Sequence, residues 1–419
     1  MKVLSLFSGC GGMDIGFEGG FTCLKRSINT HLHPDWIAED SGKWVKLIKT
    51  GFTTVFANDI RPDAKAAWTT YFSKSMGNAN DVYVIESIVD LVKRAEKGEN
   101  VFPQNIDIVT GGFPCQDFST AGKRKGFNSL RSHDGTLLKA NEPSVESRGQ
   151  LYMWMRDVIT ITKPLLFVAE NVKGLISLSD AKVIIENDFA HAADGGYIVV
   201  PAKVLQAADY GVPQSRERII FYGFKKAALN PKALEALGQP KITQEYDPYP
   251  LPTHGFTNTA KDLLPPVTCA EALSGLEEPE YSTDPSQRKF SKAKYISKRC
   301  QGQSEIKLDS IGPTIRSEHH GNIEYRRLST EHGGKHFTEL SSGLAERRLT
   351  VRECARIQTF PDDYQFILPK RDDNVSVSAS DAYKIIGNAV PCVLAYNIAM
   401  RIRDNWNKYF QEQNHDRLK

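Results

Sequence analysis

The sequence predicts an α/β protein with a doubly wound, mostly parallel Rossmann-like sheet and a smaller, irregular second domain. Three observations support this fold class. In the first half, short apolar runs alternate with segments whose apolar residues recur at helical spacing, the pattern of βαβ units. A glycine-rich turn follows the first apolar run. Between about residues 226 and 345 the alternation fades, and Pro, Gly, Ser and Thr become frequent.

Six apolar runs are expected to form strands: residues 3–8, 54–58, 106–110, 165–170, 197–204 and 218–224. Helical spacing is clearest in residues 63–72 and 151–162, and it returns in residues 350–359 and 381–403. The chain is therefore expected to form a large α/β domain (1–225), an inserted irregular domain (226–345) and a C-terminal return that completes the first domain (346–419).

Composition narrows the functional class. With 419 residues, 40% hydrophobic and 25% charged, the chain is typical of a soluble globular protein and not of a disordered or fibrous one. Its apolar runs are too short to span a bilayer, and its N-terminus is typical of a first strand, not of a signal peptide. The seven cysteines are scattered without a C-x-x-C pair, which argues against disulfides or a thiolate zinc site and favours an intracellular setting. No metal is expected.

The first candidate site is the turn after the first strand. It contains Phe7, Ser8, Gly9, Cys10 and Gly11, followed by a second glycine. Such a turn lets a ligand approach the backbone and presents the N-terminus of the next helix. The dinucleotide fingerprint G-x-G-x-x-G would need a glycine at position 14, where this chain has aspartate, so a nucleotide-like ligand without a pyrophosphate is favoured.

Asp59 ends the second expected strand, where an acid is well placed to bind ribose hydroxyls. On position alone, a helix-capping role fits this aspartate equally well.

The second candidate site is Cys115, which follows the third expected strand on a turn containing Gly112 and Pro114. A lone cysteine is usually a small buried hydrophobe, but this stiff, polar surrounding suits an exposed nucleophile better. Glu170 ends the next strand, and parallel strands end at the same edge of a sheet. Cys115 and Glu170 are therefore expected to share one pocket.

At this point six motifs, in order and over nearly the whole chain, give a specific resemblance. They are residues 7–12 (FSGCGG), 114–116 (PCQ), 170–172 (ENV), 214–218 (QSRER), 348–361 (RLT with Arg356, Gln358 and FP) and 387–390 (GNAV). Together they resemble the DNA cytosine-5 methyltransferase family, of the bacterial restriction-modification type.

The resemblance implies the chemistry. The thiolate of Cys115 adds to carbon 6 of a cytosine flipped out of duplex DNA, and carbon 5 then takes a methyl group from S-adenosylmethionine. Glu170 contacts ring nitrogen 3 and the exocyclic amine. Arg216 and Arg218 lie at the active site, where they contact the carbonyl oxygen or a nearby phosphate. Without the resemblance, two solvated arginines on a strand edge would be the preferred interpretation.

The resemblance also implies a cofactor pocket. Its expected residues, which the motifs supply, are Phe7, Ser8, Gly9, Cys10, Gly11, Asp59, Pro114, Asn388 and Ala389. Glutamate is usual in the family where this chain has Asp59, and serine (Ser87) stands where an adenine-contacting aspartate is expected, with Glu86 as a possible substitute.

By the same resemblance, residues 226–345 are a target-recognition domain, which reads base edges in the major groove. The expected DNA contacts from this domain are basic: Arg288, Lys292, Lys298, Arg299 and Arg316. Ser119, Lys123 and Arg124 are expected to contact DNA from a mobile loop after Cys115. Residues 31–50 and 131–147 are longer than the family minimum, and the second is expected to extend that loop.

Two alternatives remain beside this interpretation: a tRNA methylase of the same family, and a protein that reads DNA without methylating it. The size of residues 226–345 favours DNA over tRNA, and the retained catalytic residues argue against an inert module. The expected partner is double-stranded DNA, with a cognate restriction endonuclease or none. A monomer in the bacterial cytoplasm is expected.

Overall fold

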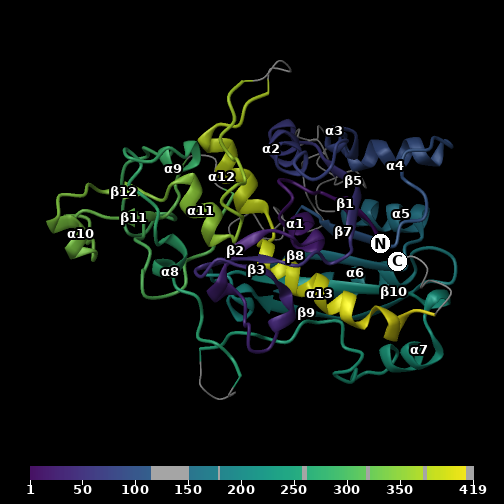
Figure 1. The fold of residues 1–419 in the computed structure, drawn as a ribbon. Helices are drawn as coiled ribbons and strands as arrows, with labels where there is room; N and C mark the ends of the chain where they lie inside the picture. The colour runs from purple at the N-terminus through teal and green to yellow at the C-terminus, as the bar shows by residue number, and fades with distance from the viewer. Residues whose placement is uncertain (115–150, 178–179, 257–261, 318–320, 371–374, 412–419) are drawn as a thin grey trace.

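The computed structural model describes residues 1–114, 151–177, 180–256, 262–317, 321–370 and 375–411. Its centre is a seven-stranded sheet in the order β6-β5-β1-β7-β8-β10-β9 (Figure 1). The strands are β1 Lys2–Leu6, β5 Thr53–Asp59, β6 Tyr83–Ile85, β7 Ile108–Gly112, β8 Leu166–Val172, β9 Tyr197–Gln206 and β10 Glu217–Lys225. Neighbouring strands from β6 to β8 pair in parallel, and β10 pairs antiparallel with both β8 and β9. The predicted doubly wound, mostly parallel sheet is therefore confirmed.

All six strands expected from the sequence are present. The seventh, β6, was missed because only three residues form it and they lie at the sheet edge.

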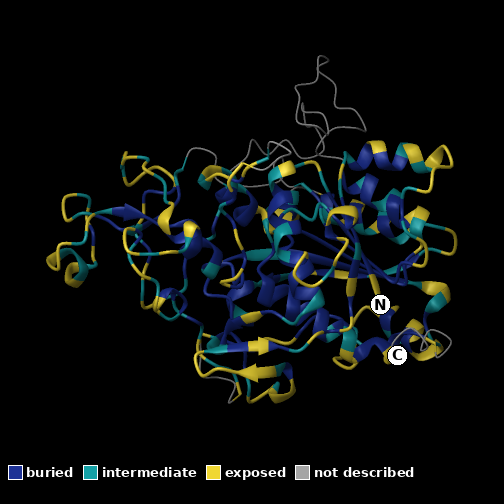
Figure 2. Ribbon diagram, turned by 45° about the horizontal axis from the view of Figure 1, so that its top comes forward, coloured by how far each residue is buried: buried dark blue, intermediate teal, exposed yellow. Residues whose placement is uncertain are grey.

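Helices cover both faces of this sheet, and successive strand residues face opposite layers. Val3, for example, packs into one hydrophobic cluster and Leu4 into the other. One face is covered by α1 Gly12–Glu18, α2 Pro62–Phe72 and α13 Cys392–Tyr409, and the other by α4 Ile88–Glu96, α5 Leu151–Thr162 and α6 Ala181–Ala190. The short α3 Ala79–Val82 precedes β6. Figure 2 shows the sheet and the inner helix surfaces as buried.

Residues 381–403, expected as one helical segment, form parts of two helices. α12 Ala379–Asn388 ends before Pro391, and α13 begins at Cys392. A proline has no N–H to continue the helical hydrogen bonds, so the chain turns there. Residues 379–409 are the one stretch in the described chain with the length and apolarity of a membrane span, but 83% of its most apolar window is buried inside the protein. It is therefore a core element of this fold.

The chain after β10 first packs on the large domain and then forms a separate lobe. α7 Pro231–Leu237 and Tyr249 join the hydrophobic cluster of the large domain. The lobe contains short elements: α8 Cys269–Leu273, α9 Pro285–Arg288, α10 Phe337–Ser341 and the two-stranded ribbon of β11 Tyr325–Arg327 with β12 Arg347–Arg348. α9, α10 and the ribbon project to one side of the sheet (Figure 1). α11 Val351–Ile357 leads the chain back.

Residues 22–48 contain an antiparallel sheet of three strands, which we call the small sheet, and its last two strands lie in the region that the sequence marked as an insertion (31–50). It consists of β2 Thr22–Leu24, β3 Ile37–Asp40 and β4 Trp44–Leu47, in the order β2-β4-β3. The sequence did not predict these strands, because charged residues interrupt their short apolar alternation.

A network of alternating charges holds the lobe together. Arg347 contacts Glu278 and Glu353, each at 2.8 Å. Arg327 contacts Glu278 at 3.2 Å and Glu339 at 2.5 Å. Both arginines are buried, so each depends on its carboxylates to offset the loss of hydration. The network joins β11, β12, α10 and α11 around one acid, Glu278.

The network predicts how the lobe responds to mutation. Glu278→Gln keeps the size of the side chain but removes the charge that Arg327 and Arg347 share. We expect the free energy of unfolding, measured by urea denaturation at neutral pH, to fall by about 3 kcal/mol, as for a broken buried ion pair. Glu280→Gln, an exposed neighbour, is the control and should have little effect.

The same variant has a pH signature. Burial by itself would raise the pKa of Glu278, but hydrogen bonds and charges from Arg347 and Arg327 lower it from 4.5 to about 2. A lowered pKa gives stability that is complete above the unfolded value and is lost as the pH falls through the folded one. The difference between wild type and Glu278→Gln should therefore shrink between about pH 5 and pH 2. A difference that stays constant over this range would contradict the assignment.

Candidate active site

The glycine-rich turn follows β1 in a left-handed conformation. Phe7 and Gly9 both have φ near +53°, and Gly11 has φ +78°. A side chain at Gly11 would collide with the Trp68 ring at 2.6 Å, so only glycine fits there. Gly9 is different, because a Cβ at that position would have no heavy atom within 4 Å. The turn is thus packed at Gly11 and open at Gly9, where a ligand can approach the backbone.

Asp59 lies at the end of β5, beside this turn. Its Oδ2 accepts a hydrogen bond from Gly9 N at 3.0 Å, and its Oδ1 accepts one from Arg61 N at 3.1 Å. Burial raises the pKa of Asp59. On the other side, Tyr83 Oη donates to Gly9 O at 2.9 Å. The turn is therefore fixed by an acid and a phenol from the two neighbouring strands.

Two other residues of the turn face inward. Ser8 joins β1 to β5, because its N donates to Asn58 O at 2.8 Å and its Oγ accepts from Asn58 N at 3.1 Å. Cys10 is fully buried, and its Sγ lies 3.2 Å from Ile385 O. Burial raises the pKa of Cys10. Both side chains therefore support the turn.

One supporting residue escaped the sequence interpretation. Asp14, in the first turn of α1, is buried and accepts hydrogen bonds from Ser5 Oγ at 2.5 Å and from Trp68 Nε1 at 2.7 Å. Burial raises the pKa of Asp14 to about 6. The residue therefore anchors Trp68, the ring that packs on Gly11. Its only sequence signal was negative: it replaced the last glycine of the dinucleotide fingerprint.

The region expected to contact adenine is occupied by local interactions. Ser87 caps α4, with its Oγ accepting from Val89 N at 3.3 Å. The Glu86 carboxylate pairs with Arg94 at 2.7 Å. The structure thus shows Glu86 paired with the helix that follows it, α4.

Glu170 lies near the end of β8 and is 7% exposed. Its Oε1 lies 2.6 Å from Arg218 Nε, which comes from the adjacent antiparallel strand β10. On the other side, Gly112 of β7 pairs in register with Glu170, and a Cβ on Gly112 would lie 2.8 Å from Glu170 Oε2. The carboxylate thus lies between an arginine and the end of β7, where a residue larger than glycine would have to displace it.

Cys115 follows Gly112 by three residues but lies outside the described residues, as do Ser119, Lys123, Arg124 and the insertion 131–147. Pro114, the last residue described before Cys115, is half-buried. The preceding Phe113 O accepts a hydrogen bond from Asn171 Nδ2 at 3.2 Å. The backbone that leads to Cys115 is therefore bound to the residue next to Glu170.

Arg216 is not oriented like Arg218. It is fully buried, and its guanidinium donates to three backbone carbonyls: Ile315 O at 2.9 Å, Gly387 O at 2.9 Å and Ala389 O at 2.8 Å. These carbonyls belong to the lobe and to the end of α12. Asn388, between two of them, is exposed. Arg216 therefore joins the last expected cofactor residues to the lobe.

Two glutamines of the recognised motifs extend this junction. Gln214 Nε2 donates to Gln358 Oε1 at 2.9 Å, and Gln214 Oε1 accepts from Ile315 N at 3.0 Å. Gln358 Nε2 in turn donates to Ile386 O at 2.7 Å. We name these residues, Gln214, Arg216 and Gln358, the polar junction.

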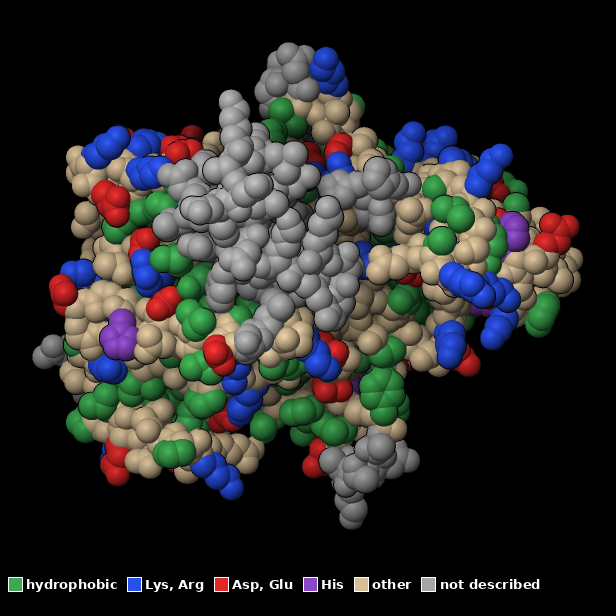
Figure 3. All heavy atoms as spheres, turned by 180° about the vertical axis from the view of Figure 1, so that it is seen from behind, with side chains coloured by type: hydrophobic (Ala, Val, Ile, Leu, Met, Phe, Trp, Pro, Cys, Tyr) green, Lys and Arg blue, Asp and Glu red, His purple; other side chains and the backbone are tan. Residues whose placement is uncertain are grey.

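Most of the expected DNA contacts in the lobe are available to solvent. Arg288, Lys292, Lys298 and Arg299 are exposed, and within the described chain none of the four pairs with an acid. Figure 3 shows Lys and Arg side chains gathered on the lobe. Arg316 differs, because it is half-buried and pairs with Glu324 at 2.9 Å. The four exposed residues therefore remain the candidates for phosphate contacts, and Arg316 is held inside the lobe.

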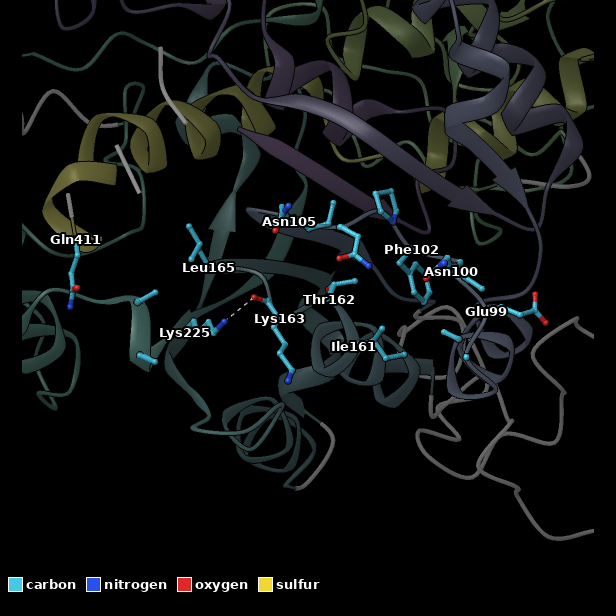
Figure 4. A pocket seen from close by; sticks show the side chains of 18 residues that line it. Glu99, Asn100, Phe102, Asn105, Ile161, Thr162, Lys163, Leu165, Lys225 and Gln411 are labelled. Carbon is cyan, nitrogen blue, oxygen red and sulfur yellow. Dashed lines mark hydrogen bonds between the residues drawn. The ribbon is translucent and has the colours of Figure 1, made fainter. Parts of the chain in front are cut away.

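The described structure also has a cavity away from these residues. A cavity of about 720 Å³ lies near the amino ends of β7 and β8, and Lys163, Lys225, Phe102 and Asn105 are among the residues that line it (Figure 4). The candidate residues above lie at the opposite, carboxyl edge of the sheet. None of those that the structure describes lines this cavity.

Known proteins share both the sequence pattern and the fold. The family model for C-5 cytosine-specific DNA methylase matches residues 37–404. Type II methyltransferase M.BsuRI of Bacillus subtilis is 31% identical over 434 residues, covering 100% of this chain and 83% of that relative. M.BspRI of Lysinibacillus sphaericus is 33% identical, covering 96% and 81%.

Among solved structures, the Dnmt2 methyltransferase of S. pombe matches the fold with a TM-score of 0.53 at 17% identity, covering 97% of this chain and 99% of that one. The family model covers most of the chain, and the relatives align over almost all of it. The chain therefore belongs to the C-5 cytosine-specific DNA methylase family, and it is a DNA cytosine-5 methyltransferase of the bacterial restriction-modification type.

Proposed function

We propose that the carboxyl edge of the sheet forms one active site, in which Cys115, Glu170 and Arg218 act on a cytosine flipped out of double-stranded DNA. The observation that carries this proposal is the Glu170–Arg218 contact of 2.6 Å beside Gly112, the strand end that leads to Cys115. A nucleophile next to a fixed acid is the arrangement that addition to an electron-poor ring requires.

S-adenosylmethionine fits the open turn as the cofactor. Gly9 leaves space at the backbone, and Asp59 offers a carboxylate at the strand end where ribose hydroxyls bind in folds of this type. Phe7, Gly11 and Pro114 border the same edge of the sheet, and the exposed Asn388 with Ala389 would close the pocket. When bound, this cofactor supplies an activated methyl group.

The protein residues prepare the cytosine for that transfer. Addition of the Cys115 thiolate to carbon 6 sends electron density into the ring and makes carbon 5 nucleophilic. After methylation, loss of the proton on carbon 5 and elimination of the Cys115 thiolate from carbon 6 would restore the ring and free the enzyme. Glu170 would stabilise this state through ring nitrogen 3 and the exocyclic amine. Arg218 holds the carboxylate by an ion pair of 2.6 Å, so Glu170 need not reorganise during the reaction. Arg216 is better explained as a positioning residue, because both of its terminal guanidinium nitrogens donate to backbone carbonyls.

The lobe within residues 226–345 would recognise the target sequence. Its exposed cations, Arg288, Lys292, Lys298 and Arg299, suit contacts with phosphates, which orient a protein on DNA without specifying bases. Extrusion of the cytosine costs a few kcal/mol, which such contacts help to offset. We place the enzyme in the bacterial cytoplasm as a monomer, modifying chromosomal DNA with or without a cognate restriction endonuclease.

The direct test is incubation with labelled S-adenosylmethionine and either duplex DNA or tRNA. We expect label in the DNA only, and bisulfite sequencing of DNA from expressing cells will identify the methylated site. Cys115→Ser should abolish label transfer while leaving duplex binding, measured by gel shift, close to wild type. Label in tRNA alone would falsify the proposal, and loss of DNA binding in the variant would mean that Cys115 is structural.

The acid has its own test. Glu170→Gln keeps the shape of the side chain but removes its charge, so we expect kcat to fall by about a hundredfold or more, the usual contribution of a positioned acid or base. Affinities for DNA and cofactor should change little. Glu217→Gln is the matched control, since Glu217 begins the neighbouring strand and pairs only with exposed Lys173 among the described residues. Equal losses in both variants would contradict the assigned role.

The cofactor turn can be tested by calorimetry. Asp59→Ala removes the acceptor for Gly9 N and the proposed ribose contact, so cofactor affinity should fall by roughly tenfold to a hundredfold, the value of hydrogen bonds to a charged group. Because burial raises the pKa of Asp59, cofactor affinity of the wild type should also decline on mild acidification. Asp63→Asn, four residues further along, is the control, because Asp63 pairs with Arg61. Unchanged affinity in Asp59→Ala would exclude Asp59 from the pocket.

A further inference from the structure

The small sheet of β2, β3 and β4 lies between the large domain and the lobe. In Figure 1, β2 and β3 appear between α13 and α8, and contacts on both sides agree with this placement. Trp36 of the small sheet is buried against the large domain, where it meets the ring of Tyr396 edge-on at 5.3 Å. Tyr396 Oη also donates to Ile48 O at 3.3 Å. One side of the small sheet is thus fixed to α13 by packing.

The other side contacts the chain that leads into the lobe. Arg26 Nε pairs with Glu271 Oε1 of α8 at 3.0 Å, and its Nη2 donates to Pro265 O at 3.2 Å. Asn29 is buried, and its Nδ2 donates to Thr253 O at 3.0 Å and to Asp262 O at 2.7 Å. These contacts connect the small sheet with four residues in the segment 253–271.

α11 completes the attachment. The Arg356 guanidinium lies over the ring of Trp44, 4.8 Å from its centroid, and Arg356 Nη1 donates to Ala272 O and Ser274 O at 3.2 and 3.0 Å. Lys43 Nζ of the small sheet donates to the same Ser274 O at 2.7 Å. The C-terminal end of α8 is therefore held by the small sheet and by α11, the helix that leads to Gln358 of the polar junction.

We infer that this small sheet is a strut that positions the target-recognition lobe relative to the catalytic edge, with Arg26 as a positioning residue for DNA. This inference rests on the proposed function of the lobe. Arg26 and Glu271 have side chains 37% and 34% exposed, and ion pairs with such exposure contribute little to folding stability. What the pair does fix is the direction in which α8 leaves the strut. A small rotation at this point moves the distant base-reading surface, while the cofactor turn stays in place.

Steady-state kinetics of Arg26→Gln test the inference. We expect KM for duplex DNA to rise roughly threefold to tenfold, the range of mutations that alter coupling between sites. The preference for the enzyme's own site over sites with one changed base should fall. The kcat at saturating DNA, KM for S-adenosylmethionine and the melting temperature should stay near wild type. Lys25→Gln is the matched control, because Lys25 pairs with Asp40 inside the strut at 2.6 Å.

A second variant identifies the pair as the cause. Glu271→Gln removes the other charge, so it should raise KM for DNA as well, and adding it to Arg26→Gln should bring no further rise. Unchanged KM and site preference in Arg26→Gln would overturn the inference. So would an equal effect of Lys25→Gln, or a lowered melting temperature with an equal loss of kcat, which would indicate a merely structural role. Failure of the proposed function is distinct, because the wild-type enzyme would then not methylate DNA.

Discussion

The site depends on the parallel pairing of β5, β1, β7 and β8. Because parallel strands end at one edge, this register brings together the turn after β1, Asp59 after β5, the chain toward Cys115 after β7, and Glu170 on β8. The closest approach that this register imposes is between Gly112 and Glu170, which pair directly on neighbouring strands. A Cβ at Gly112 would lie 2.8 Å from Glu170 Oε2, so a larger residue there would have to displace the carboxylate. The antiparallel β10 then adds Arg218 from the opposite direction, which a wholly parallel sheet would not place there.

A second constraint joins the C-terminal return to this edge. Arg216 has its charge buried among the carbonyl oxygens of Ile315, Gly387 and Ala389, and such a burial is tolerable only when the donors are satisfied. Gln214 and Gln358 extend the same polar layer. Residues expected from sequence resemblance to act on the substrate or to mark a motif thus divide into two roles. Arg218 faces the acid, whereas Arg216 and the glutamines hold together three distant segments of chain.

The sequence was informative where function and local pattern coincide. Six strands followed from apolar runs, and the neighbourhood of Gly112 and Glu170 followed from the rule that parallel strands end together. Long-range partners were not predictable. Asp14 pairs with Trp68, 54 residues away, and nothing in either local sequence indicates this hydrogen bond. Arg216 looked solvated because its acceptors come from residues 99 to 173 positions further along the chain. The single helix expected over 381–403 failed at Pro391, a breaker visible in the sequence but outweighed by the apolar periodicity on either side.

The lobe contains buried apolar side chains, such as Ile306, Ile323 and Leu328, and a network of charges also orders it. Glu278 with Arg327 and Arg347 fixes its interior, while Arg288, Lys292, Lys298 and Arg299 remain exposed. Buried arginines that are matched by carboxylates leave the outer cations without local competitors, so these are available to a polyanion. The lobe must still face the catalytic edge at a fixed distance, and charge pairs within it cannot ensure that. α8 supplies the link, because Arg26 holds it from the strut and Arg356 holds it from α11, the helix that ends next to Gln358. A lobe attached in this way can present a rigid surface although most of its own chain is irregular.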